Sequence, residues 1–216
     1  MEAKYDSIEE TLDPEDWDAM RTLGHQMVDD LLDDLANLTH APAWRHAPET
    51  VKAHFDDNLP LDPQKPEMVY QEFQEYIQPY LIGNKHPRFW GWVVGTGTVM
   101  GAFAELLAAG NNSPSGIMSY NSTNYVERQV IDWCKSMLGY PAEASGLLTS
   151  GCSASNLIGL TVARNTKAGH DLRKQGLQAA PHKMVLYASS EAHSSLQKAV
   201  ELLGLGSDAL RKVPVN

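Results

Sequence analysis

Residues 149–165 read TSGCSASNLIGLTVARN, and the character of the stretch changes halfway along it. Residues 149–155 are all small, whereas residues 156–163 form an apolar run typical of a helix. Small side chains let a ligand approach the backbone closely, and the N–H groups of a first helical turn have no partner inside the helix. A phosphate would satisfy such donors. Taken alone, the stretch is more typical of an ordinary serine-capped helix start, and an anion site there is the alternative that the rest of the sequence has to support.

The sequence on either side of this stretch alternates between two patterns. Helical periodicity is expected at about residues 99–110, 122–139, 154–168 and 191–204, and strand-prone runs are FWGWVV (89–94), GLLTS (146–150) and KMVLYAS (183–189). Alternating strands and helices predict an α/β layer around a mostly parallel sheet. Ligands bind such sheets beyond the carboxyl ends of the strands, so we expect the exits LLTSGCSAS and LYASSEAHSS to face one pocket.

Residues 1–84 have a different organisation, with helices separated by prolines. One amphipathic helix is predicted from apolar residues at three- and four-residue spacing: Trp17, Met20, Leu23, Met27, Leu31 and Leu35. Residues 39–67 hold five of the twelve prolines and suggest an extended segment with a short helix inside. Residues 66–81 predict a further helix with Val69, Phe73 and Ile77 on one face, ended by Pro79. Such a segment makes a poor independent core, so we expect it to pack on a second subunit.

Composition excludes several classes of protein. A net charge of −10 and a pI near 5.2 leave no basic stripe for nucleic acid. Two cysteines are too few for a secreted disulfide framework, and the start MEAKYDSIEE has no signal-peptide pattern. No apolar stretch reaches 18 residues, so we expect no membrane span and a cytoplasmic protein. The eight histidines are scattered and neither cysteine has a ligand-spaced partner, which predicts no metal site.

Two nucleotide motifs and a hydrolase motif can be compared with the sequence. Gly95, Gly97 and Gly101 miss the dinucleotide spacing by one residue, and the P-loop string is absent. The string GCSAS at 151–155 nearly matches G-x-S-x-G, and Ser153, Asp171 and His193 follow the chain order of an α/β-hydrolase. The second glycine is missing and Asp171 lies in a polar loop. A serine hydrolase that uses Ser153 and His193 remains an alternative.

Four strings occur in an order that resembles one known family. They are NKHPRFWGWVVGTGT (84–98), NYVERQVIDWCKSMLGYP (124–141), GLLTSGCSASNLIGLTVAR (146–164) and LYASSEAHSSLQKAVELLGLG (186–206). Together they resemble the pyridoxal-phosphate-dependent group II decarboxylases, which include the aromatic-amino-acid and glutamate decarboxylases. The resemblance runs from about residue 65 to the end of the chain.

The resemblance implies a fold and an architecture. The fold is the α/β large domain of the fold type I, aspartate aminotransferase-like, pyridoxal-phosphate enzymes, present here incompletely. Residues 1–84 would be the helical dimer-forming segment of a homodimer, and residues 85–216 the first part of the large domain. The implied cofactor is pyridoxal 5'-phosphate, and the implied reaction is the decarboxylation of an amino acid.

The resemblance also implies roles for individual residues. The backbone N–H of Cys152 and the hydroxyl of Ser153 would bind the cofactor phosphate, with Cys152 at a position usually occupied by Gly or Ala. Ala154 stands where many members have Glu. His193 would stack on the pyridine ring and pass protons as a catalytic residue; a helix-start histidine facing solvent is the alternative.

Trp92 and Gly95 would lie on the substrate side of the cofactor, although Trp92 could equally be a core aromatic. Other positions are interpreted as structural: Phe89 and Trp90 as core, and Glu127, Asp132 and Trp133 as held in place on their helix.

One departure from the family concerns its chemistry. The Schiff-base lysine and the aspartate that pairs with the pyridinium nitrogen would lie downstream of Asn216, and no lysine here occupies the family's His-Lys setting. The chain is therefore expected to be a fragment or a truncated relative that does not catalyse as it stands. A non-catalytic, dimerising paralogue is an alternative. The run FWGWVV favours an aromatic substrate, and the oxidative, aldehyde-forming variant of the family stays open.

Overall fold

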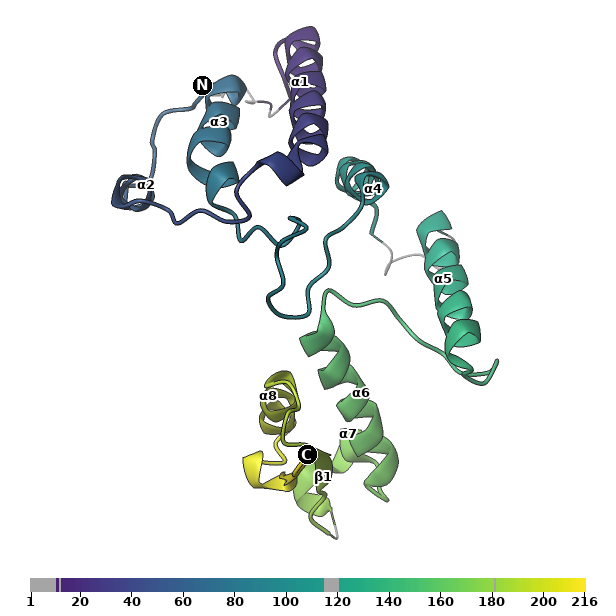
Figure 1. Cartoon of the computed structure of the whole chain (residues 1–216). Helices are drawn as coiled ribbons and strands as arrows, with labels where there is room; N and C mark the ends of the chain where they lie inside the picture. Colours follow the sequence, from purple (N-terminus) through teal and green to yellow (C-terminus); the bar gives the residue numbers. More distant parts are fainter. Residues whose placement is uncertain (1–10, 12, 115–120, 181) are drawn as a thin grey trace, which may run out of the picture. The chain divides into compact units, whose positions relative to one another are not determined.

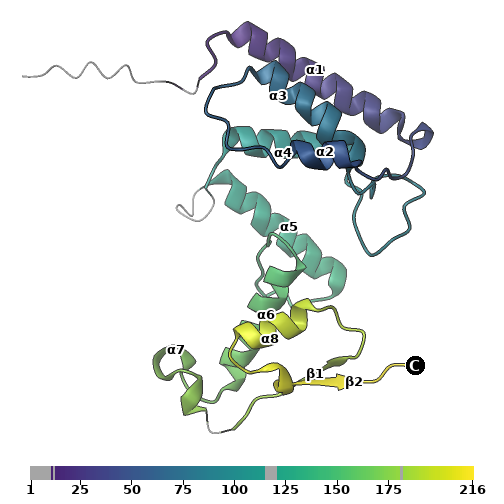
Figure 2. The same cartoon turned by 90° about the vertical axis from the view of Figure 1, so that its left-hand side faces the viewer.

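The computed structural model of the chain (Figures 1 and 2) describes residues 11, 13–114, 121–180 and 182–216. Contacts divide the chain into two compact units, Met1–Asn112 and Ser113–Asn216. The predicted boundary between a dimer-forming segment and a large domain, at 84/85, concerns assembly and stays a prediction.

The first unit is helical, as the sequence predicts. Its elements are α1 (Trp17–Ala36), a 3-10 turn (Leu38–His40), α2 (Glu49–His54), α3 (Pro66–Glu72), a π-turn (Phe73–Ile77), a second 3-10 turn (Gln78–Tyr80) and α4 (Val99–Asn111). The short helix α2 lies inside the proline-rich segment, which confirms that expectation. Pro79 does not end a helix at once, because it occupies the first turn of the second 3-10 segment, where its missing N–H costs no hydrogen bond.

Helices α1 and α3 lie side by side (Figure 2) and are joined by polar contacts. The Tyr70 hydroxyl donates to Asp30 Oδ2 at 2.8 Å, and Gln74 Nε2 donates to the same oxygen at 2.9 Å. Tyr70 is buried, whereas Val69, Phe73 and Ile77 are each more than one-third exposed. The face that packs within the unit is therefore the hydrogen-bonded Tyr70 face, and the predicted face of Val69, Phe73 and Ile77 is left partly exposed.

The second unit holds the sheet. Its elements are α5 (Ser122–Leu138), α6 (Cys152–Lys167), α7 (Leu172–Gln175), a 3-10 turn (Leu177–Ala179), β1 (Leu186–Ser189), α8 (Ser195–Leu202), a 3-10 turn (Ser207–Ala209) and β2 (Leu210–Val213). Strands β1 and β2 are parallel, with Leu186 opposite Leu210 and Ser189 opposite Val213. The order β1–α8–β2 is the crossover unit of an α/β fold. Helix α8 packs against α6; its Ala199 and Val200 are buried, as is Leu203 directly after the helix.

Two of the three strand-prone runs do not form strands. The run KMVLYAS contains β1, but residues 89–94 and 146–150 pair with no strand in the described part of the chain. Trp92 has a left-handed φ of 56°, and Trp90 is 89 % exposed. The assignment of Trp90 to the core is therefore wrong, while Phe89 is half-buried. A strand needs a hydrogen-bonded neighbour, and β propensity alone does not supply one.

Candidate cofactor site

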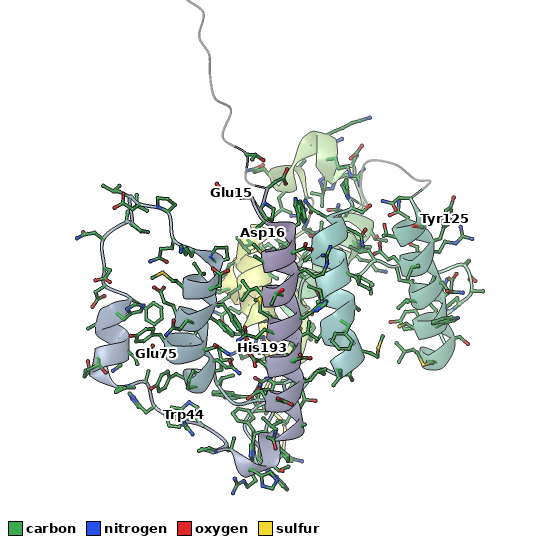
Figure 3. The ribbon with its side chains drawn as sticks, turned by 90° about the horizontal axis from the view of Figure 1, so that it is seen from above. Glu15, Asp16, Trp44, Glu75, Tyr125 and His193 are labelled. Carbon is green, nitrogen blue, oxygen red and sulfur yellow. The ribbon has the colours of Figure 1, made fainter. Side chains whose placement is uncertain are left out.

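Helix α6 begins with free backbone donors. Gly151 precedes it in an extended conformation without a side-chain cap, and its first helical bond runs from Ser155 N to Gly151 O at 3.1 Å. In the described structure, the N–H groups of Cys152, Ser153 and Ala154 therefore have no hydrogen-bond partner. In contrast, the side chains of Asp16 (Figure 3), Thr98 and Asn121 cap the first turns of α1, α4 and α5. The start of α6 thus keeps the donors that an anion would bind.

The hydroxyls around this turn differ in availability. Thr149 Oγ1 donates to Gly151 O at 3.1 Å, so in its 2.6 Å pair with Ser155 Oγ the proton comes from Ser155. The exposed Ser153 hydroxyl bonds to none of the described residues. Ser153, at the second position of the helix, therefore has a hydroxyl that is available to a ligand.

Helix α5 fixes the segment that leads into the turn. Glu127 Oε1 accepts a hydrogen bond from Leu148 N at 2.8 Å. Lys135 Nζ donates to the carbonyl oxygens of Ala142 and Ala144 and pairs with Asp132 at 2.8 Å, and its hydrogen bond lowers the pKa of the Asp132 carboxyl. Glu127 and Asp132 are therefore structural, as predicted. Trp133 is not held in place within the described unit, because it is 57 % exposed.

His193 lies in the turn between β1 and α8. Ser189 shapes this turn: its hydroxyl accepts from Glu191 N and its carbonyl from Ala192 N, both at 3.0 Å. Helix α8 therefore begins only at Ser195, later than the expected residue 191. The imidazole is exposed, and its Nδ1 lies 2.9 Å from Ser195 Oγ and 3.2 Å from Ser195 N.

Two residues that sequence reasoning missed connect His193 to α6. Asn156 Nδ2 donates to Ser195 Oγ at 2.8 Å and lies 3.5 Å from Cys152 Sγ. A chain of polar side chains thus links His193 to the first turn of α6, so Cys152, Ser153 and His193 belong to one region of the second unit. Asn156 could have been noticed as the polar residue that opens the apolar run 156–163. Ser195 carried no comparable signal.

Trp92 and Gly95 belong to the first compact unit, whereas Cys152, Ser153 and His193 belong to the second. Trp92 is 78 % exposed, with its ring centroid 6.1 Å from that of Phe89, so it is not a core residue. The Gly95 carbonyl accepts a hydrogen bond from Asn84 Nδ2 at 2.9 Å. Their assignment to the substrate side stays a prediction.

The hydrolase triad is not formed by the described side chains. Asp171 Oδ1 accepts from Arg173 N at 3.1 Å at the start of α7, and its Oδ2 lies 3.9 Å from Lys174 Nζ. The His193 nitrogen that a triad aspartate would orient is bonded to Ser195 instead. The geometry therefore gives the hydrolase alternative no support.

A cavity of about 780 Å³ lies at the amino-terminal ends of the two strands. Residues 182–185, which lead into β1, and residues 206–209, which lead into β2, line much of it. Ligands of parallel sheets bind at the opposite, carboxyl ends, where the turn of His193 begins. In the described ranges, no cluster of three potential metal ligands occurs. None of the helices described there is long and apolar enough to cross a membrane.

A comparison with known protein families shows to which family the chain belongs. Residues 48–216 match the pyridoxal-dependent decarboxylase conserved domain. The chain belongs to this family. The cofactor of the family is pyridoxal phosphate, and the fold is that of the fold type I enzymes, of which the chain covers only a part.

Named relatives of the family show the same relationship. The chain is 30 % identical to an aromatic-L-amino-acid decarboxylase of Bacillus atrophaeus, over 86 % of this chain and 37 % of that protein. It is 28 % identical to a phenylacetaldehyde synthase of Petunia hybrida, over 94 % of this chain and 40 % of that protein. The crystal structure of Catharanthus roseus tryptophan decarboxylase with L-tryptophan matches 94 % of this chain and 43 % of its own, with a TM-score of 0.79 and 23 % identity. The chain thus spans about two-fifths of the proteins it matches.

Proposed function

We propose that the complete enzyme is a pyridoxal-phosphate-dependent carboxy-lyase that acts on an aromatic L-amino acid. The observation that carries the proposal is the uncapped first turn of α6, joined by hydrogen-bonded side chains to His193. Three free N–H groups, the free hydroxyl of Ser153 and the positive end of a 16-residue helix suit a phosphate. The residues present therefore fit the cofactor of the family.

The proposed roles follow from these groups. The N–H of Cys152 and the hydroxyl of Ser153 bind the phosphate, and the exposed His193 ring stacks on the pyridine ring. His193 also moves protons at the reacting centre. Trp92 and Gly95 shape the substrate side. When bound, pyridoxal phosphate supplies an electron sink for the electrons left by the departing carboxylate.

We propose further that these 216 residues alone do not catalyse decarboxylation. The sequence contains one His-Lys pair, His182–Lys183, but both side chains are exposed and they precede β1, at the end of the strand away from His193. The lysine and the aspartate that the family uses would then come from sequence beyond residue 216. A truncated, non-catalytic paralogue that only dimerises is the alternative.

The decisive experiment uses the full-length protein. Absorbance and fluorescence would measure pyridoxal phosphate binding, and CO2 release would be screened with tryptophan, tyrosine, phenylalanine, DOPA and glutamate. We expect cofactor binding and CO2 release with an aromatic substrate. Release of an aldehyde with consumption of oxygen would indicate the oxidative variant, whose possibility the relationship to a phenylacetaldehyde synthase supports. Binding of cofactor without turnover of any amino acid would favour the non-catalytic paralogue and overturn the proposal.

Assembly and location complete the proposal. We propose a homodimer joined through residues 1–84, because of the four residues Leu23, Met27, Leu31 and Leu35 on α1 only Leu23 is buried within the chain. A cytoplasmic location is supported by Cys134 and Cys152, which are both free and exposed thiols and suit a reducing compartment.

A further inference from the structure

The hydrogen bonds around His193 define which of its nitrogens carries a proton. Asn156 Nδ2 donates to Ser195 Oγ at 2.8 Å, and Ser195 Oγ lies 2.9 Å from His193 Nδ1. The backbone N–H of Ser195 also points at Nδ1, at 3.2 Å. His193 Nε2 has no hydrogen-bond partner among the residues that the structure describes.

The direction of each bond follows from what each group can donate. A backbone N–H is only a donor, so Nδ1 must accept from it and cannot carry a proton of its own. The amide group of Asn156 donates to Ser195 Oγ, so the Ser195 proton is directed to Nδ1. A neutral imidazole with an accepting Nδ1 carries its proton on Nε2.

We propose that Asn156 and Ser195 are positioning residues that hold His193 as the neutral Nε2–H tautomer and fix the plane of its ring. This inference deepens the proposed function, since its value to catalysis rests on His193 lying against the cofactor. The ring then presents Nε2–H as its one outward donor, while Nδ1 anchors it to α8 and, through Asn156, to the first turn of α6. Ser195 is 3 % exposed, so water does not compete for its hydroxyl.

A purely structural role for the same contacts predicts something different. Asn156 and Ser195 also join α6 to α8, so removing either side chain would lower stability in both cases. Only the positioning role predicts a change in the protonation pattern of the imidazole. The tautomer is therefore the quantity to measure, and it needs no bound cofactor.

The test is long-range ¹H–¹⁵N correlation NMR of the full chain with labelled histidine, without pyridoxal phosphate, at a pH above the ordinary histidine pKa. The His193 signals would be assigned from a His193→Gln variant. We expect wild type to show an unprotonated Nδ1 and a protonated Nε2. Ser195→Ala should shift the tautomer ratio toward a mixture, and Ser195→Thr should restore the wild-type pattern.

Asn156→Asp is the variant that tests the positioning role most directly, because a carboxylate can only accept hydrogen bonds. The Ser195 proton would then turn to the new carboxylate, Ser195 Oγ would accept from His193, and the population of the Nδ1–H tautomer should rise. Asn165→Asp is the matched control on α6, because the Asn165 Oδ1 only accepts, from Arg164. Ser194→Ala is the control on the neighbouring exposed hydroxyl.

Each outcome decides the inference by itself. An Nδ1–H tautomer in wild type, or the same ratio in wild type, Ser195→Ala and Asn156→Asp, would overturn it. If the tautomer behaves as expected but the full-length protein neither binds pyridoxal phosphate nor releases CO2, the positioning role stands and the proposed function fails.

Discussion

Ser153 and Ser155 stand two residues apart at the start of α6, but only Ser153 has a hydroxyl free for a ligand. In the full-length protein, Ser153→Ala should weaken pyridoxal phosphate binding by about 1.5–3 kcal/mol, the size of a hydrogen bond to a charged group. Ser155→Ala is the control, because the Ser155 proton goes to Thr149. Fluorescence titration of the cofactor would measure both. Unchanged affinity in Ser153→Ala would remove Ser153 from the site.

His193 is tested by the shape of its replacement. If the imidazole stacks on the cofactor, His193→Phe should bind pyridoxal phosphate more tightly than His193→Ala, by the roughly 0.5–1.5 kcal/mol of an offset-stacked pair. Both variants should lose about 10²–10⁴-fold in CO2 release, since neither can transfer a proton. Cofactor dissociation and CO2 release would be measured in the full-length enzyme. Equal cofactor affinity in wild type, Phe and Ala variants would contradict stacking.

At the scale of single residues, the sequence allowed us to predict properties that depend on neighbouring residues, but not contacts between distant ones. The small residues of 149–155 raised the possibility of free donors at a helix start, because that property depends on a few neighbouring residues, and the family resemblance then favoured it over a serine cap. Asn156 and Ser195 lie 39 positions apart and meet only because α6 packs on α8. No local pattern contains such a contact, so their role needed the fold.

At the scale of elements, the contact between α1 and α3 leads us to expect that the stability of the fold depends on pH. Burial, followed by the hydrogen bond and charge of Asp30, raises the pKa of Tyr70 from 10.0 to about 12. Because the folded pKa lies above the unfolded value, this contribution to stability is complete below about pH 10 and is lost as the pH rises toward about 12. Tyr70→Phe should remove that part of the pH dependence.

Urea unfolding followed by circular dichroism, at several pH values from about 9 to about 12, would measure this dependence. Tyr187→Phe is the control, because Tyr187 is exposed on β1. An unchanged slope of stability against pH in Tyr70→Phe would contradict the role of the Asp30 contact.

Helices were predicted well and strands poorly, for a physical reason. A helix satisfies its own backbone, so the periodicity of residues 99–110 or 122–139 was enough to place α4 and α5. A strand is defined by its neighbour. The run 183–189 has β2 beside it and forms β1, whereas 89–94 and 146–150 have none among the described residues.

At the scale of the whole molecule, the helical N-terminal segment should depend on its partner. Besides Met27, exposed apolar side chains of residues 1–84 include Trp17, Trp44, Phe55, Leu59 and Leu61, which a small isolated segment cannot bury. A fragment of residues 1–84 should therefore be unfolded or self-associated, and not a folded monomer. Sedimentation and circular dichroism would distinguish these states. A compact, helical monomer would show that the segment is autonomous.

Gly83 sets a limit on how this chain can vary through evolution. Its backbone is left-handed, with φ at 74°, and a Cβ there would lie 1.9 Å from the carbonyl oxygen of Ala43. Every missense change of its codon adds that atom, so selection should remove all of them. Gly110, inside α4, has open space at the same position, and alanine there improves helix propensity. A saturation library sorted for folded protein should keep only glycine at residue 83 and accept alanine at residue 110.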